Sequence, residues 1–485
     1  MPSNRRLPQL LLAALVLATI AVFLAYPTYT TYDSLYSLLW GRELLHGHTP
    51  VFEVYRAPTE HPIAIAFGAF LSLFGDAANR LMVAATLASF VVLAVGLYRL
   101  ARTAFTPLVG VVAAALLVTR ADFPFLAVRA YIDIPYMALV VWAAVLEARA
   151  HAAGQFRHAR GMLVLVLLAG AGMMRPEAWL LSGLYWLWLA IDRAKPWSYR
   201  IGTAAVAAVG PAVWLVTDKL VTGDFLYSLH STSGLAASLG RSRGASALPH
   251  ATLAFLKSLD TWPVLLVGAL GLALALYLFP RRSAIPVIVL VVGVGTFLVV
   301  GLAGFSIIDR YLLVPSLMMM VFAAVAIGGW TMLEDGTRWR RWWSRAAAVV
   351  ALAGIALALA DLHLGHYSSD LSFRRESHRA LVAALRDPAT KRAIRECGPV
   401  SVPTHKLIPD VRWIADLPAD RVFARGDPDR VDDVRRGVAI YVLTRTAVFE
   451  QAFVVGSDPT RAQIPPRGFH RIATSRYYGV YASCG

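Results

Sequence analysis

The N-terminal stretch LPQLLLAALVLATIAVFLAYPTYTTYDSLY, residues 7–36, joins an apolar run to a group of tyrosines and threonines that holds one acid. The apolar run, 7–25, follows Arg5 and Arg6 and is long enough to cross a bilayer. No small-x-small cleavage pattern follows it, so we expect a retained first span rather than a signal peptide. Asp33 then lies just beyond a membrane surface.

The composition of the whole chain points the same way. Of 485 residues, 58% are hydrophobic and only 16% are charged, whereas soluble domains carry roughly a quarter charged residues. The net charge of +16 does not indicate a nucleic-acid partner, because no basic stripe is interleaved with aromatic residues. Arginines that orient spans and meet anionic lipid head groups account for it.

Apolar runs separated by basic loops continue along the chain, and at about 20 residues per span they predict a polytopic α-helical membrane protein with about eleven transmembrane helices. With the N-terminus in the cytoplasm, five inner connections each hold two or more Arg or Lys residues, which is the positive-inside pattern. These connections are YRLARTAF (98–105), EARAHAAGQFRHAR (147–160), IDRAKPWSYR (191–200), FPRRSAIP (279–286) and RWRRWWSRA (338–346). The expected spans are 7–25, 78–98, 107–120, 134–148, 161–174, 177–191, 201–217, 262–279, 284–304, 311–333 and 346–363.

This topology gathers polar segments on the outer face. The first outer loop, 26–80, contains HPIAIAFGAFLSLFGD (61–76), which is short for a span and suits an interfacial helix. A second outer loop is 222–250. After a transmembrane domain, 1–365, residues 366–485 read as a small extracytoplasmic α/β domain. In it, 377–397 has helical periodicity, and GVAIYVLTR and FHRIATSRYYGVYASC resemble strands.

Cys397 and Cys484 are the only cysteines, and both lie in this C-terminal region. Two cysteines allow one pairing. An oxidising compartment favours a disulfide, and two unpaired thiols are the alternative.

Acids of the first outer loop are the candidate catalytic groups. A carboxylate beside aromatic residues at a membrane surface is suited to take a proton from an acceptor hydroxyl or amine, and Asp33 and Glu60 are such carboxylates. The alternative is a solvated loop whose acids serve solubility. Together with His61, they also suggest a site for Mg²⁺ or Mn²⁺. No zinc motif, Walker A loop or dinucleotide fingerprint occurs in the chain.

The order of the motifs resembles that of the C-type integral-membrane glycosyltransferases, which include the protein O-mannosyltransferases and the aminoarabinose transferase of lipid A. The resemblance covers about the first 365 residues. The family pattern often reads His-Pro-Pro, where this chain has His61-Pro62-Ile63. The motifs are Tyr32-Asp33, VYRAPTEHPIAIAFGAFLSLFGD (54–76), AYIDIPYMALVVWAAVLEAR (130–149), MMRPEAWLL (173–181) and IDRYLLVPSL (308–317).

The resemblance implies a sugar transfer, with inversion at the anomeric carbon, from a polyprenyl-phosphate donor to a glycan, lipid or protein acceptor at the outer face. It implies Asp33 as the base, with Glu60 as the runner-up or as a group that orients the acceptor or a metal. Tyr32, His61, Asp133 and His230 are then candidate contacts to acceptor or sugar.

The leaving lipid phosphate needs cationic donors, and arginine suits phosphate best. For any single outer arginine, the alternative role is snorkelling to lipid head groups. The candidates are Arg56, Arg129, Arg175, Arg241, Arg243 and Arg310, the last with its neighbour Tyr311.

Two other classes of protein fit the composition. A transporter or lipid-linked glycan flippase would carry ionisable residues near the bilayer midplane and internal repeats. Segments such as VIVLVVGVGTFLVVG (287–301) carry no charge, and no clear repeat is present. A membrane-anchored binding protein, with the C-terminal domain as its working part, is the third alternative.

Overall fold

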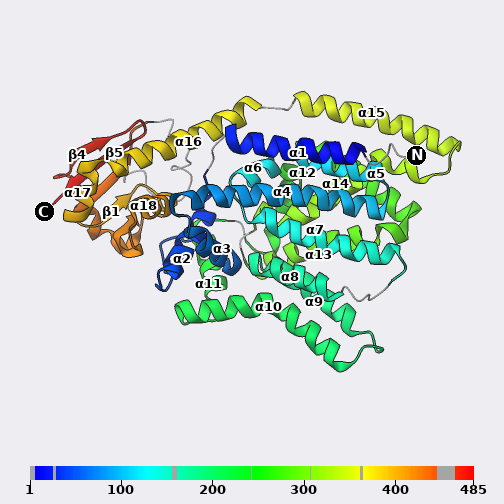
Figure 1. Cartoon of the computed structure of the whole chain (residues 1–485), viewed down its shortest axis with the longest axis horizontal. Helices are drawn as coiled ribbons and strands as arrows, with labels where there is room; N and C mark the ends of the chain where they lie inside the picture. The colour runs from blue at the N-terminus through cyan, green and yellow to red at the C-terminus, as the bar shows by residue number, and fades with distance from the viewer. Residues whose placement is uncertain are drawn as a thin grey trace.

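The computed structural model describes residues 6–25, 29–155, 161–241, 243–305, 307–360, 364–444 and 465–484. A bundle of long helices makes up most of the molecule, and a small mixed sheet flanked by helices lies at one end (Figure 1). The N-terminus lies at the opposite end of the bundle from that sheet (Figure 1). The predicted fold class, a polytopic helical protein with a small C-terminal α/β unit, is confirmed.

Each of the eleven predicted spans falls on a helix. By length and hydropathy, however, only seven helices of the described residues qualify as spans, or eight if α5 and α6 (Asp122–Val128), which bend by 63°, form one broken span. The others fall short because α8 and α9 have 14 residues each and α7 carries charged residues. The helices are α1 (Arg6–Ala25), α4 (Ala78–Ala104), α5 (Pro107–Thr119), α7 (Asp133–Ala152), α8 (Gly161–Met174), α9 (Glu177–Ala190), α10 (Trp197–Thr222), α12 (Leu248–Leu278), α13 (Pro280–Leu302), α14 (Leu313–Gly328) and α15 (Arg338–Ala360).

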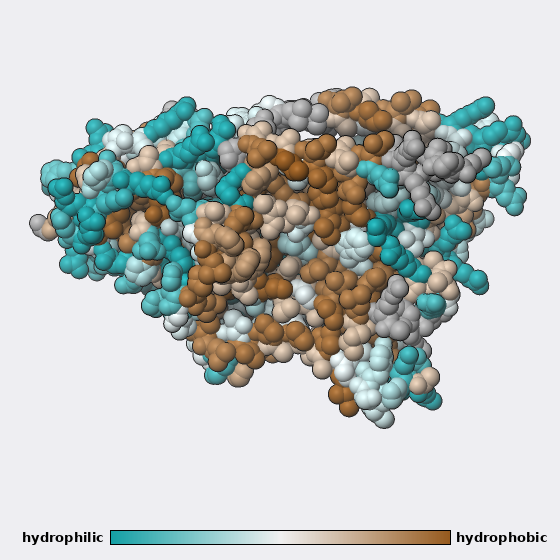
Figure 2. All heavy atoms as spheres, viewed as in Figure 1, coloured by the Kyte–Doolittle hydropathy of each residue, from teal (hydrophilic) through white to brown (hydrophobic). Residues whose placement is uncertain are grey.

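Helix α14 lies in the interior of the bundle, whereas α1 and α15 lie at its edge. Of the most apolar window of each helix, 89% is buried for the span that contains α14, 0% for α1 and 6% for α15. The exposed side chains of α1, such as Leu10, Leu17 and Leu24, need hydrocarbon around them. Figure 2 shows a broad apolar band over the helices between two hydrophilic ends. The protein is therefore a multi-pass membrane protein.

Helices α2 (Tyr32–Leu45) and α3 (Pro62–Ser72) cross with their backbones in contact. A Cβ atom on Gly41 would lie 2.2 Å from the backbone nitrogen of Ala69, and one on Gly68 would lie 2.3 Å from the carbonyl oxygen of Ser37. Only glycine allows so close an approach. The predicted helix after His61 is present as α3, with proline in its first turn. Its close packing against α2 fixes the direction of α2.

The C-terminal sheet has the strand order β2-β1-β3-β5-β4, in which β1 is parallel to β2 and β3 and the β3–β5–β4 pairs are antiparallel. The two strand-like stretches predicted from sequence are confirmed as β3 and as β4 with β5, while Arg445 lies outside the described residues. The elements are α16 (Leu364–Arg386), α17 (Pro388–Glu396), β1 (Val400–Val402), α18 (Ile408–Ala415), β2 (Val422–Ala424), β3 (Gly437–Val442), β4 (His470–Thr474) and β5 (Tyr478–Ser483).

Two features close this C-terminal unit. The stretch 377–397 forms helices as predicted, but it divides at Asp387, whose side chain caps α17 ahead of Pro388. A disulfide joins Cys397, just after α17, to Cys484, just after β5. The open question of their pairing is thus settled as a disulfide. The domain boundary after residue 365 stays a prediction; α16, Leu364–Arg386, runs across it.

The C-terminal unit docks on α2. The guanidinium of Arg412, fully buried in α18, forms an ion pair with Glu43, and Arg42 forms one with Asp416 at 3.1 Å. Trp40 and other buried residues of α2 belong to the same hydrophobic cluster as the core of the sheet. Helix α2 is therefore held between α3 on one side and the C-terminal unit on the other.

The glycine contact between α2 and α3 gives a first prediction. Gly68→Ala places a methyl group against backbone atoms, which cannot move aside as a side chain can, so we expect a loss of about 1–3 kcal/mol of stability. Gly183→Ala is the matched control, because a Cβ atom there meets nothing within 4 Å. Thermal unfolding of the two purified variants and of wild type measures the loss. Equal melting temperatures for Gly68→Ala and Gly183→Ala would contradict a close backbone contact between α2 and α3.

Candidate active site

The first turn of α2 is fixed to the segment that joins α6 to α7. The backbone N–H of Thr31 donates to the carbonyl of Arg129 at 2.9 Å, and Ser34 Oγ donates to the carbonyl of Ala130 at 2.5 Å. Thr31 caps the helix through its own side chain. Asp33 therefore lies at a helix N-terminus, where the peptide dipoles favour a negative charge.

Asp33 is the first member of a chain of ion pairs. Arg310 Nη1 lies 3.2 Å from an oxygen of Asp33 and 3.5 Å from an oxygen of Asp133. The other oxygen of Asp133 pairs with Arg175, whose Nη2 also lies 2.6 Å from Glu177 Oε1. These five residues, Asp33, Arg310, Asp133, Arg175 and Glu177, are called the charge chain below.

The charge chain has a buried end and an accessible end. The side chains of Asp133, Arg175 and Glu177 are 0%, 7% and 8% exposed, whereas those of Asp33 and Arg310 are 24% and 28% exposed. Buried charges are stable only when they are paired. The buried end therefore acts as a fixed anchor, and the accessible end can meet a substrate.

Aromatic rings line the same residues. The guanidinium of Arg310 lies 5.5 Å from the ring centre of Tyr131, and that of Arg175 lies 5.4 Å from the ring of Tyr311 and 5.8 Å from that of Tyr136. Such contacts stabilise a cation and restrict its rotamers. Tyr311, the sequence neighbour of Arg310, thus contacts Arg175.

The other arginines that were predicted to bind phosphate differ in how they relate to the charge chain. Burial, followed by the charge of Arg310, lowers the pKa of Arg241, which lies in the loop after α11 (Tyr227–Ser238) and so brings a third cation near the accessible end. Arg56 donates to the carbonyl of Ser238 at 3.1 Å, which ties the first outer loop to the second. Arg243 is exposed, and among the described residues no ion pair joins it to the charge chain.

Glu60 belongs to a separate cluster, which consists of two carboxyl groups and one hydroxyl group. It is 1% exposed, and Ser228 Oγ lies 3.0 Å from Glu60 Oε2 and 2.7 Å from Asp218 Oδ1. One hydroxyl proton cannot serve two ionised carboxylates, so one carboxyl group carries a proton. Burial raises the pKa of Glu60 to about 8, which makes Glu60 that group near neutral pH.

The other predicted contacts to acceptor or sugar, His61, His230 and Tyr32, lie in three different environments. Burial, and then the charge of Arg175, lowers the pKa of His61 to about 4, and its ring lies 5.7 Å from that of Trp214. His230 is 66% exposed and pairs with Asp224 at 2.7 Å. Tyr32 donates through its hydroxyl to the carbonyl of Arg56.

Asp33 and Glu60, the two acids predicted for a metal site, lie in different clusters. Within the described ranges, no three His, Cys, Asp or Glu residues are placed so that they could hold one ion. Asp33 is paired with Arg310 and Glu60 bonds Ser228, so the two acids serve different partners.

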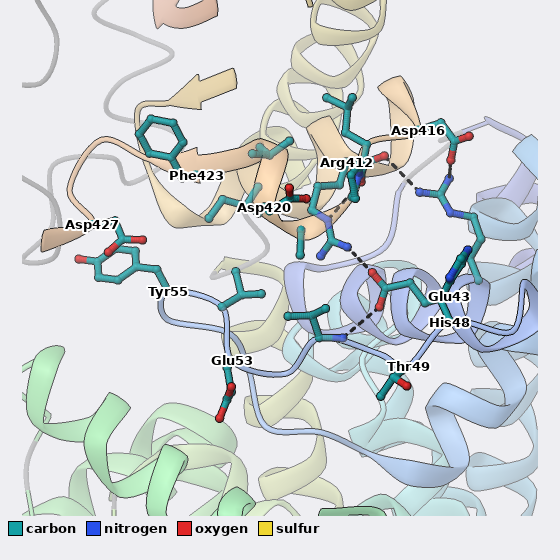
Figure 3. Close-up of a pocket in the computed structure, with 18 of the residues that line it drawn as sticks. Glu43, His48, Thr49, Glu53, Tyr55, Arg412, Asp416, Asp420, Phe423 and Asp427 are labelled. Atoms are coloured by element: carbon teal, nitrogen blue, oxygen red, sulfur yellow. Dashed lines mark hydrogen bonds and ion pairs between the residues drawn. The ribbon is translucent and has the colours of Figure 1, made fainter. Parts of the chain in front are cut away.

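A cavity of about 900 Å³ opens between the end of α2, the loop after it and the C-terminal unit (Figure 3). The ion pair of Glu43 with Arg412 lies on its wall. Tyr55 lines it from the loop after α2, and Phe423 lines it from the C-terminal unit. Acids such as Glu53 and Asp427 add polar groups to the lining (Figure 3). Tyr55 is next to Arg56, whose carbonyl binds Tyr32, so this cavity ends close to the first turn of α2.

Sequence reasoning missed several residues of this site. Glu177 stands two positions after Arg175, and this spacing in MRPE was the available signal for a paired carboxylate. Ser228 and Asp218, in contrast, join Glu60 from 168 and 158 positions away, and no local pattern marks such a contact.

The comparisons with known proteins place this geometry on a known fold. No protein-family model and no curated protein sequence matches the chain. A structure of ArnT from Cupriavidus metallidurans bound to undecaprenyl phosphate aligns with a TM-score of 0.55 at 13% identity over 97% of both chains. The archaeal oligosaccharyltransferase AglB from Archaeoglobus fulgidus, in complex with an inhibitory peptide and a dolichol-phosphate, aligns with a TM-score of 0.56 at 12% identity, over 100% of this chain and 75% of AglB.

A third structure, the A. fulgidus oligosaccharyltransferase in complex with Zn and sulfate, aligns with a TM-score of 0.51 at 11% identity and covers 97% of this chain and 73% of that one. The likeness to all three extends through the C-terminal unit, beyond the first 365 residues on which the sequence motifs lie. The chain therefore has the fold of these C-type glycosyltransferases over its full length.

The buried end of the charge chain gives a second prediction. Arg175→Gln leaves Asp133 and Glu177 buried with one cation fewer, and removing one partner of a buried pair costs about 3–5 kcal/mol. We expect a large fall in the temperature of thermal unfolding. Arg243→Gln, at an exposed arginine, is the control; a fall of the same size in both variants would contradict the assigned role of Arg175.

Glu60 gives a prediction for pH. Its pKa is about 8 in the folded protein, against an ordinary value of 4.5, so its stabilising contribution is complete below pH 4.5 and is lost as the pH rises through 8. Wild-type protein should lose stability, on the order of a few kcal/mol, between pH 5 and pH 9. Glu60→Gln should flatten this profile, whereas Glu53→Gln, at an exposed acid of the same loop, should not. Parallel profiles for all three proteins would rule out a buried, protonated Glu60.

Proposed function

We propose that this protein is an inverting glycosyltransferase that moves a sugar from a polyprenyl-phosphate donor to an acceptor on the outer face of the membrane. The observation that carries the proposal is the charge chain, with Asp33 and Arg310 at its accessible end. Undecaprenyl phosphate bound to ArnT and dolichol-phosphate bound to AglB, two proteins of the same fold, support a lipid-phosphate donor.

The donor phosphate binds on the arginine side of the accessible end. Arg310 already holds two carboxylates, and Arg241 brings a further positive charge near it. When the bond between the anomeric carbon and the phosphate oxygen breaks, the electron pair goes to that oxygen, and preorganised guanidinium groups stabilise the charge that develops. Arg175 takes part indirectly, because it fixes Asp133 and through it Arg310.

Asp33 takes the proton of the acceptor. The acceptor oxygen or nitrogen attacks the anomeric carbon from the side opposite the phosphate, forms the new bond there and gives its proton to the Asp33 carboxylate. The helix N-terminus and Arg310 favour the ionised form of Asp33 that this role needs. Glu60, which holds a proton near neutral pH, is suited to fix the loop rather than to act as base.

The acceptor reaches Asp33 from the large cavity of Figure 3. Its aromatic rings suit the faces of sugar rings, and its carboxylates suit hydroxyl groups as hydrogen-bond acceptors. Tyr32, the neighbour of Asp33, packs edge-on against the buried ring of Tyr36, with ring centres 5.1 Å apart, and this contact supports the acceptor side of the first turn of α2. Glycan, lipid and protein acceptors are all compatible with this arrangement.

The membrane orientation has the N-terminus in the cytoplasm and the C-terminal domain, 366–485, outside. The basic connections support it through the positive-inside rule. The Cys397–Cys484 disulfide supports it independently, because structural disulfides belong to oxidising compartments.

A requirement for Mg²⁺ or Mn²⁺ stays a prediction. The likeness to an oligosaccharyltransferase in complex with Zn and sulfate makes the test worthwhile, and transfer measured with and without a chelator decides it. No step above depends on an ion, because arginine side chains are available for the phosphate charge.

A transporter or flippase is the alternative function. It has weaker support, because the accessible end of the charge chain is formed at the ends of helices and not in mid-span. A binding protein that works through its C-terminal domain alone would keep its function when that domain is expressed by itself, whereas the proposed enzyme would not.

Asp33→Asn tests the proposed function most simply. The amide cannot accept the proton, so transfer from a synthetic polyprenyl-phosphate sugar should fall by roughly 10²–10⁴-fold with little change in the melting temperature. Asp76→Asn, at an exposed acid of the same outer loop, is the control and should retain transfer. Full turnover by folded Asp33→Asn would remove Asp33 from the base role.

A further inference from the structure

A second, smaller cavity of about 160 Å³ lies where the C-terminal unit meets the membrane helices. Tyr29, Thr30 and Arg129 line it from the bundle, and Arg374 on α16 lines it from the other side together with Lys406. None of the five residues of the charge chain lines this cavity. Tyr32, the neighbour of Asp33, also lines it, so the cavity lies beside the proposed site but outside the charge chain.

The lining carries an excess of positive charge. Arg129, Arg374 and Lys406 are cations, and Asp410 is the one carboxylate among the residues that line the cavity. Asp410 lies 3.5 Å from the ring nitrogen of His378, which also lines the cavity. Arg374 donates through Nε to Asp370 at 2.7 Å, outside the lining.

Two donors in this lining are buried without acceptors. The hydroxyl of Thr30, a residue that is 7% exposed, and Nε of Arg129 have no hydrogen-bond partner among the described residues. A buried hydrogen-bond donor that has no acceptor costs free energy of folding. Burial, and then the nearby charge of Arg374, lowers the pKa of Arg129 to about 10, so two guanidinium groups repel each other across the cavity.

An anion between these groups would accept hydrogen bonds from the unpartnered donors and would screen the repulsion between the two guanidinium groups. We propose that this cavity is a binding site for one phosphate group, held by Arg129, Arg374 and the hydroxyl of Thr30. Guanidinium and hydroxyl donors match the oxygens of a phosphate, and the volume exceeds the roughly 30 Å³ that one water occupies in the liquid. The phosphate belongs either to a phospholipid head group or to a free or acceptor-borne phosphate.

Binding of inorganic phosphate to the full-length protein in detergent tests the site without any transfer assay. We expect wild type to bind phosphate and Arg129→Gln to bind it at least 10-fold more weakly. Thr30→Val, which keeps the shape of the side chain, should weaken binding as well and serves if Arg129→Gln does not fold. Arg243→Gln is the control and should bind as wild type does.

Native mass spectrometry of the same samples separates the two sources. A phospholipid that wild type retains and that Arg129→Gln and Thr30→Val lose assigns the site to a lipid head group. Binding of inorganic phosphate without retained phospholipid assigns it to a free or acceptor-borne phosphate. Equal binding of phosphate and lipid by wild type and both variants, or no binding of either by wild type, overturns the proposal.

Discussion

A fully buried carboxylate, Asp133, is the constraint on which the rest of the site depends. It is stable because Arg175 and Arg310 pair with its two oxygens. These arginines come from the α8–α9 junction and from the short turn Asp309–Leu312 before α14, so the pairing brings the ends of distant helices together. Arg310 then presents its exposed edge to Asp33. A polar group that is costly to bury thus fixes the position of the accessible end of the charge chain.

Helix α2 carries Asp33 into that position, and its placement has several independent causes. Its first turn bonds to the backbone of Arg129 and Ala130, its middle crosses α3 at two glycines, and its end pairs with the C-terminal unit through Glu43. The same docking forms both cavities, because each is lined by residues from the two sides. The C-terminal unit therefore supplies part of the lining of both cavities.

The sequence predicted the helices and several members of the site, for physical reasons that are local. Apolar runs and basic loops revealed the helical segments, and alternating Val, Ile and Tyr residues revealed β3 and β5. Asp33, Asp133, Arg175 and Arg310 each stand in a short motif near a helix end, and the structure brings these four predicted residues together in the charge chain. All eleven predicted spans fall on helices, although α8 and α9, which are apolar, have only 14 residues each.

Contacts between distant segments could not be predicted in the same way. The bond between Ser228 and Glu60, the ion pair of Arg412 with Glu43 and the cavity around Arg129 each depend on packing in three dimensions. Their residues have no periodicity or spacing that singles them out. The Cys397–Cys484 pairing was open for a related reason, because the sequence defines the possible pair but not whether the bond forms.

A structure of the protein with a bound polyprenyl phosphate tests the roles of Arg310 and Asp33 most directly. We expect density for the phosphate within hydrogen-bonding distance of Arg310, with the Asp33 carboxylate facing the position of the sugar carbon. Density for the phosphate at a site that contacts neither Arg310 nor Arg241, with the Asp33–Arg310 ion pair closed to the ligand, would contradict it.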